Sequence, residues 1–210
     1  MNRKEAEMVL DSVAGQLVSP LGFNPFRCLA YARLANDATA ILSFGGRLDP
    51  RGYYAFTLGA GLHFEAVSNW LDDNSSKAPV TVGTPMHFLR GDKSFAEWKF
   101  SNAGDLDGLR GAISSDLNNL ALPFIDRYSK LPNLREAVES ADVEDWIKLG
   151  LSQDRRVNVL AAIQMVQGDT RGAMKTLDGA LAERRTALPK RRIEIERLRR
   201  RLVEAGNAEG

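Results

Sequence analysis

The strongest constraint on the fold is an alternation of apolar residues in the segment 53–64. Every second position shares this character, namely Tyr54, Phe56, Leu58, Ala60, Leu62 and Phe64. A period of two places these side chains on one face of an extended strand. Gly59 and Gly61 fall on the other face, where the missing side chains allow a packed helix or a ligand to approach closely.

Two further extended runs precede this strand, at residues 26–36 and 38–48. Turn-forming residues separate the three runs, Asn36-Asp37 after the first and Asp49-Pro50-Arg51-Gly52 after the second. Asn, Asp, Pro and Gly favour the backbone conformations that tight turns need. The simplest arrangement is therefore an antiparallel meander of three strands.

Helical patterns flank these strands. Residues 3–18 carry an apolar stripe at helical spacing that ends before Pro20, and residues 65–73 form a short helix. A long helix begins near Asp105, capped by that residue or by Asn102, and is bent or restarted at Pro123.

A second hairpin is expected from residues 80–90 and 94–100, with its turn at 90–93. The order is then helix, three strands, helix, two strands, helix. This order predicts an α+β domain in which an antiparallel sheet of about five strands is covered by helices.

From residue 143 the sequence is helical in character. Small and apolar residues recur there as Leu160-Ala161, Gly168-Asp169, Ala173, Leu177 and Ala180-Leu181, which resembles one tetratricopeptide-type helical hairpin. A solenoid needs about three stacked repeats, so a single hairpin is expected to dock on the α+β domain or on a partner. We therefore divide the chain into an α+β domain, 1–140, and an all-α extension, 141–210.

The net charge of +1 hides an asymmetry along the chain. Residues 1–150 hold 15 Lys and Arg against 19 Asp and Glu, whereas residues 151–210 hold 13 against 8. In the last helix, Ile195, Leu198 and Leu202 form one apolar stripe that is expected to anchor it. Its arginines, including Arg192, Arg199, Arg200 and Arg201, are then predicted to face solvent as a partner-binding set. They could attract nucleic acid or an acidic protein, or simply form a solvated helix face interrupted by glutamates.

Composition excludes several classes of protein. With 44% hydrophobic and 26% charged residues, the chain matches an ordinary globular protein rather than a disordered or collagen-like one. No apolar run reaches the roughly 18 residues of a membrane span, and the first residues lead into an amphipathic segment rather than a signal peptide. We therefore expect a cytoplasmic protein without membrane contact.

Residues that could carry chemistry are few. His63 and Glu65 would share a strand face, and His87 could lie beside them, which makes a two-histidine, one-carboxylate metal set the candidate. A hydrogen-bonded, partly buried histidine is the commoner role for such residues. Cys28 alternates with Ala30, Ala32 and Leu34, so it is expected to be buried and inert. No phosphate-binding loop or nucleophile elbow occurs, and we predict neither a catalytic set nor a cofactor.

Three short segments of the α+β domain form a set, namely Leu21-Gly22-Phe23, Phe56-Thr57-Leu58-Gly59-Ala60-Gly61 and Leu122-Pro123-Phe124-Ile125-Asp126-Arg127-Tyr128-Ser129. Together they resemble a bacterial family known only as a domain of unknown function. The resemblance covers about residues 1–140 and implies a fold and a bacterial origin, but it carries over no functional residues.

These observations favour a non-enzymatic protein-interaction module. Several aromatic residues could serve an interface, namely Tyr31, Tyr53, Tyr54, Trp70 and Trp98. Nucleic-acid binding through the terminal arginines is one alternative. A metal-dependent enzyme that uses His63, Glu65 and His87 is the other.

Overall fold

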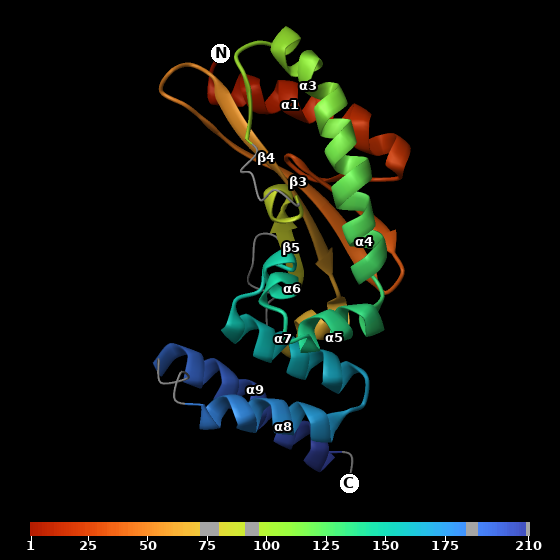
Figure 1. Cartoon of the computed structure of the whole chain (residues 1–210), viewed down its shortest axis with the longest axis vertical. Coiled ribbons are helices and arrows are strands. Elements are labelled where there is room, and N and C mark those ends of the chain that lie inside the picture. Colours follow the sequence, from red (N-terminus) through yellow and green to blue (C-terminus); the bar gives the residue numbers. More distant parts are fainter. Residues whose placement is uncertain (72–79, 91–96, 184–188, 209–210) are drawn as a thin grey trace. The chain divides into compact units, whose positions relative to one another are not determined.

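The computed structural model describes residues 1–71, 80–90, 97–183 and 189–208 (Figure 1). Contacts within the chain define two compact units, one of residues 1–63 and 82–130 and the other of residues 64–81 and 131–210. This division differs from the predicted one, because residues 131–140 and the internal segment 64–81 group with the C-terminal helices. The second unit is therefore discontinuous in sequence.

The first unit is built on a six-stranded antiparallel sheet. Its strands are β1 (Asn24–Arg27), β2 (Ala30–Ala35), β3 (Ala38–Leu48), β4 (Tyr54–His63), β5 (Val82–Pro85) and β6 (Trp98–Phe100). Strands β1 to β5 pair in sequence order, and β6 pairs with β4. The predicted α+β class and the central meander are confirmed.

The first extended run is two strands rather than one. Cys28 and Leu29 form a turn between β1 and β2, and Leu29 adopts a left-handed backbone with φ of 54°. Cys28 is exposed in this turn, so the prediction that it is buried is wrong. The buried face of β2 carries Tyr31, which is 2% exposed, whereas Leu34 on the opposite face is 87% exposed. An aromatic side chain buries more apolar area than alanines do, so it takes the core position.

The predicted second hairpin is also wrong, because β5 and β6 do not pair with each other. Both pair with β4, β5 along Gly59–Leu62 and β6 along Tyr54–Phe56. Strand β3 occupies one edge of β4, and the other edge is long enough for two short strands placed one after the other. The turn expected at 90–93 lies largely outside the described residues.

Three helices cover one face of this sheet (Figure 1), namely α1 (Arg3–Val18), α3 (Ala103–Asp116) and α4 (Leu122–Tyr128). Helix α1 begins with a capping box, in which Asn2 Oδ1 accepts from the Glu5 amide and Glu5 Oε2 accepts from the Asn2 amide. Asn102, not Asp105, caps α3. A π-helical turn over Leu117–Ala121 leads into α4. Pro123 lacks the amide that would bond to Asn119, so the helix widens before it without ending.

Aromatic side chains fill the core of the first unit. Phe56 stacks on Trp98 with 5.5 Å between ring centroids, and Tyr31 meets Phe44 edge-on at 6.1 Å. The buried Tyr31 hydroxyl donates to Asp11 Oδ1 of α1 over 2.6 Å. Burial and this bond raise the pKa of Tyr31. The hydrogen bond thus links the sheet to the helix above it.

The described part of the second unit is built of helices. They are α2 (Glu65–Leu71), α5 (Leu131–Glu139), α6 (Val143–Lys148), α7 (Gln153–Val166), α8 (Thr170–Ala182) and α9 (Pro189–Ala208). Helices α7 and α8 form the predicted hairpin, and Gly168 in the turn has φ of 76°, a value that favours glycine. Helix α2 packs against α7.

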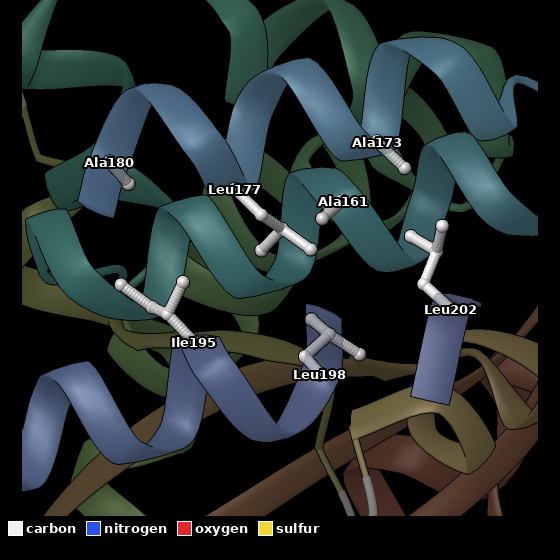
Figure 2. Close-up of a cluster of buried hydrophobic side chains, with 7 residues drawn as sticks. All are labelled: Ala161, Ala173, Leu177, Ala180, Ile195, Leu198 and Leu202. Atoms are coloured by element: carbon white, nitrogen blue, oxygen red, sulfur yellow. The ribbon is translucent and has the colours of Figure 1, made fainter. Parts of the chain in front are cut away.

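Helix α9 docks on this hairpin through its apolar stripe. Figure 2 shows Ile195, Leu198 and Leu202 pointing from α9 toward the α7–α8 pair, where Ala161 and Leu177 complete the cluster. All three α9 side chains are buried. The prediction that this stripe anchors the helix is confirmed.

Within the residues that the structure describes, no helix is long and apolar enough to cross a membrane.

Candidate functional site

An open groove of about 530 Å³ runs between α7 and α8, with α5 at one end. Several of its lining residues are small or apolar, namely Val157, Leu160, Gly172, Gly179 and Ala180. Charged side chains also line the groove, namely Arg135, Glu139, Arg156, Asp169, Lys175 and Glu183. The volume lies in the range of roughly 300–1,000 Å³ that is usual for ligand sites.

The groove exists because one face of α8 lacks large side chains. Gly172, Thr176 and Gly179 are spaced by four and three residues and therefore lie on the same face of the helix. A Cβ atom added at Gly179 would meet no heavy atom within 4 Å, so this position opens directly to the hollow. Glycine here costs helix stability and leaves space above the helix.

Arg135 closes the end of the groove near α5. Its Nε contacts Glu139 Oε1 at 2.8 Å, its Nη2 contacts Asp169 Oδ2 at 2.8 Å, and its Nη1 donates to Gln167 Oε1 at 2.9 Å. The hydrogen bond to Glu139 is the main cause that raises the pKa of Arg135. Arg135 therefore ties α5 to the turn between α7 and α8, and the carboxylates of Glu139 and Asp169 are both engaged.

Asp169 also caps α8. Its Oδ1 accepts from the Gly172 amide over 2.9 Å. This bond first, and Arg135 second, lower the pKa of Asp169. A Cβ atom at Gly172 would overlap the Asp169 carboxylate as it lies here, so a side chain at this position would require that carboxylate to shift.

Arg156 has a structural role at the wall of the groove. Its guanidinium lies over the Trp146 ring at 4.0 Å and donates to the carbonyl oxygens of Val138, Glu139 and Ser140 at the end of α5. Burial lowers the pKa of Arg156. Carbonyls at a helix C-terminus lack helical partners, and this arginine supplies donors to them.

Two hydrogen-bond donors in the groove are not engaged in this way. Gln164 is only 6% exposed, and its Oε1 accepts from Thr176 Oγ1 over 2.9 Å. Its Nε2 donates to no acceptor within the described part of the chain. Lys175 is exposed at the rim and forms no ion pair with any described residue.

The arginines predicted as a free partner-binding set are largely engaged within the second unit. Arg192 pairs with Glu196, and Arg199 pairs with Asp178 of α8. Arg201 donates to the carbonyl oxygens of Trp70 at 2.9 Å and Asn69 at 3.0 Å.

Arg201 therefore caps the end of α2, and Arg192 and Arg199 form ion pairs within the chain, whereas partner binding by these arginines stays a prediction. Glu196 lies four residues before Arg200 but pairs with Arg192 instead. Arg200 is exposed and forms no ion pair with a described residue.

The three metal candidates lie in different kinds of element. His63 ends β4, Glu65 is in the first turn of α2, and His87 lies in a 3-10 turn where its ring contacts that of Phe88 at 4.2 Å. Because Glu65 is helical, the strand alternation that would place it beside His63 does not apply. No group of three His, Cys, Asp or Glu side chains in the described residues could hold a metal ion.

Comparison with known proteins adds no relative. No protein-family model matches the sequence, and no curated protein or solved structure matches it. The resemblance to a bacterial family of unknown function therefore stays a prediction.

The groove was not predicted from the sequence. The signal that could have revealed it was the pair Gly172 and Gly179, seven residues apart within a predicted helix.

Proposed function

We propose that this protein is a non-enzymatic protein-interaction module, and that the groove between α7 and α8 binds a segment of a partner protein. The observation that carries the proposal is the open groove of about 530 Å³ beside Gly179. Its mixed lining suits a peptide, because apolar atoms can receive side chains while polar groups orient the bound segment. We also propose that the protein is bacterial, on the three short motifs, and cytoplasmic, on the sequence pattern described above.

The charged groups around the groove support binding rather than chemistry. Asp169 caps α8, Arg135 joins α5 to the helical turn, and Arg156 caps α5. Each is held by structural contacts, so none is poised to exchange a proton with a substrate.

Nucleic-acid binding through α9 receives less support. Arg201 is directed to backbone carbonyls and Arg199 to Asp178, which reduces the positive charge that could meet phosphates. The ring of Trp70 is covered on one face by Arg201, with 5.9 Å from the guanidinium carbon to the ring centroid. A covered ring offers less surface on which a base could stack.

Photo-crosslinking in the cells of origin tests the proposal. A crosslinking amino acid is placed at Gly179 and, as a control, at Gly111 of α3, which is likewise exposed with no heavy atom within 4 Å of an added Cβ. We expect one defined protein to be captured from position 179 and not from position 111. Purified partner should then bind wild type and Gly111→Trp but not Gly179→Trp. Identical capture from both positions, or none from 179, would contradict the proposal.

A further inference from the structure

We infer that the segment bound in this groove is acidic, and that Lys175 and Gln164 receive its carboxylate. This inference rests on the proposed function and adds the chemistry of the partner. Some polar groups of the groove have partners within the protein and others do not, and the difference favours an acidic ligand.

The carboxylates in the groove are committed to groups of the protein itself. Glu139 and Asp169 both contact Arg135, and Asp169 also accepts from the Gly172 amide. Glu183 likewise has an interaction within the chain, and its charge acts on Arg156. A basic ligand would have to compete with these contacts for a carboxylate.

The uncommitted groups are donors. Gln164 is nearly buried, and its amide nitrogen has no acceptor among the described residues although Thr176 satisfies the oxygen. This nitrogen is not among the buried polar atoms that lack a partner, so it reaches solvent in the open groove, where a bound acceptor can take the place of water. A carboxylate oxygen accepts such bonds more strongly than a neutral carbonyl does.

The charge of the α8 rim agrees with an acidic ligand. Lys175 and Arg171 lie one helical turn apart, both are exposed, and neither forms an ion pair within the part of the chain that the structure describes. Two adjacent positive charges attract a carboxylate and repel a basic segment.

The α5 end of the site has the opposite sign. Glu136 is exposed there and lines an adjoining hollow together with Arg135 and Glu139. The acidic residues of the ligand are therefore expected at the α8 rim, and not at the α5 end.

The test is a nuclear magnetic resonance titration of the ¹⁵N-labelled full chain. The probes are a capped alanine–leucine peptide carrying two glutamates, its glutamine isostere and its lysine counterpart. We expect the glutamate peptide to shift the side-chain NH₂ signals of Gln164 and the amide signals of Lys175 and Thr176. The glutamine and lysine peptides should bind at least about tenfold more weakly, because they lack the charge-assisted bonds.

Two variants and one control complete the test. Lys175→Gln, at an exposed position, and Gln164→Met, which keeps the volume, should each weaken the glutamate peptide about tenfold. Lys130→Gln removes the same charge from an exposed position in the other unit and should leave binding unchanged. Equal binding of the glutamine isostere, unchanged binding by Lys175→Gln, or shifts confined to residues outside the groove would overturn the inference, as would no binding by any probe.

The two proposals can fail separately. If the partner captured from position 179 binds Lys175→Glu as well as wild type, the groove is an interaction site but its ligand is not acidic. If the glutamate peptide binds at Lys175 but position 179 captures no protein in cells, the groove recognises carboxylates and the partner-binding function is the part that fails.

Discussion

The two units are stabilised by different kinds of contact. In the first unit, buried aromatic side chains such as Tyr31, Phe44 and Phe56 fill the space between sheet and helices. In the second unit, the buried cluster beneath α9 contains only alanine, leucine and isoleucine, and Ala161 and Ala173 let the helices approach closely. The first unit therefore places more of its packing energy in a few large residues.

In the second unit, arginine side chains supply part of the stabilisation that large aromatic residues supply in the first unit. Arg156 donates to carbonyls at the end of α5, and Arg201 does the same at the end of α2. Arg155 donates to the carbonyls of Val80 and Thr81. A positive charge at a helix C-terminus is favourable for the dipole and satisfies free carbonyls. Long arginine side chains thus bind the ends of helices that pack through small side chains.

The largest effect is expected in the aromatic core. Phe56→Ala removes a fully buried ring that contacts Trp98 and Phe100, and it should cost about 3–5 kcal/mol of the free energy of unfolding. Phe26→Ala, at a partly exposed ring on the edge strand β1, should cost less than about 1 kcal/mol. Urea unfolding followed by circular dichroism measures both. Similar losses for the two variants would mean that the ring of Phe56 does not carry the core.

A somewhat smaller loss is expected where α9 docks. Leu198→Ala should destabilise the protein by about 2–5 kcal/mol, because the side chain is buried among alanines that cannot fill the space. Ile193→Ala is the matched control, since Ile193 lies on the same helix but is 62% exposed, and it should change stability by less than about 0.5 kcal/mol. If both variants are as stable as wild type, α9 is not held by this cluster.

The arginine contacts predict a smaller effect still. Arg201→Gln removes donors to two carbonyls at the end of α2 and should cost about 1–2 kcal/mol. Arg200→Gln removes the same charge one residue away, where no ion pair to a described residue exists, and should change stability by less than about 0.5 kcal/mol. Thermal unfolding of the pair separates a specific cap from a general effect of charge. Equal shifts would favour the general effect.

The two glycines of the groove should respond in opposite ways. Gly179→Ala should stabilise α8 by about 0.5–1 kcal/mol, because the added methyl group enters open space and alanine favours helix. At Gly172 the same change displaces the Asp169 carboxylate, so the gain should be cancelled. Denaturant unfolding of both variants measures this contrast. A stabilised Gly172→Ala would show that the cap tolerates a side chain.

The variants Gly172→Ala and Gly179→Ala should also differ in how their stability depends on pH, because only the first disturbs Asp169. The pKa of Asp169 is lowered in the folded chain, so its ionised form contributes stability above the unfolded pKa of about 3.9, and that contribution is lost as pH falls through the lower folded pKa. In Gly172→Ala the pKa of Asp169 should rise toward its ordinary value, and in Gly179→Ala it should not move. A carboxyl ¹³C titration measures the pKa of Asp169 in both variants. An unchanged pKa in Gly172→Ala would argue against the cap as the cause of the lowered pKa.

Local periodicity predicted much of the fold. The alternation in 53–64 correctly predicted β4, and the spacing of Ile195, Leu198 and Leu202 correctly predicted the docked face of α9. Such patterns succeed because a strand or helix must bury one side whatever it packs against.

The predictions that were wrong concern features that hydrophobic periodicity alone does not determine. Both faces of β2 contain apolar residues. Cys28 was predicted to be buried because it shares the face of Ala30, Ala32 and Leu34, whereas the face of Tyr31 is the buried one. Arg201 reaches Trp70, which lies 131 residues earlier in the chain, and no local pattern encodes that contact. The groove depends on the absence of side chains at Gly172 and Gly179, which a search for reactive residues passes over.

The discontinuity of the second unit has a consequence for biosynthesis. Helix α2 leaves the ribosome about 80 residues before α7, the helix it packs against, which at roughly 5–20 residues per second is a delay of about 4–16 s. Val67, buried in the finished protein, and Trp70, which packs against the α9 cluster, lack these partners throughout that interval. The nascent chain therefore exposes these two apolar side chains while the rest of the α+β unit is still being synthesised, and slower translation would prolong that exposure.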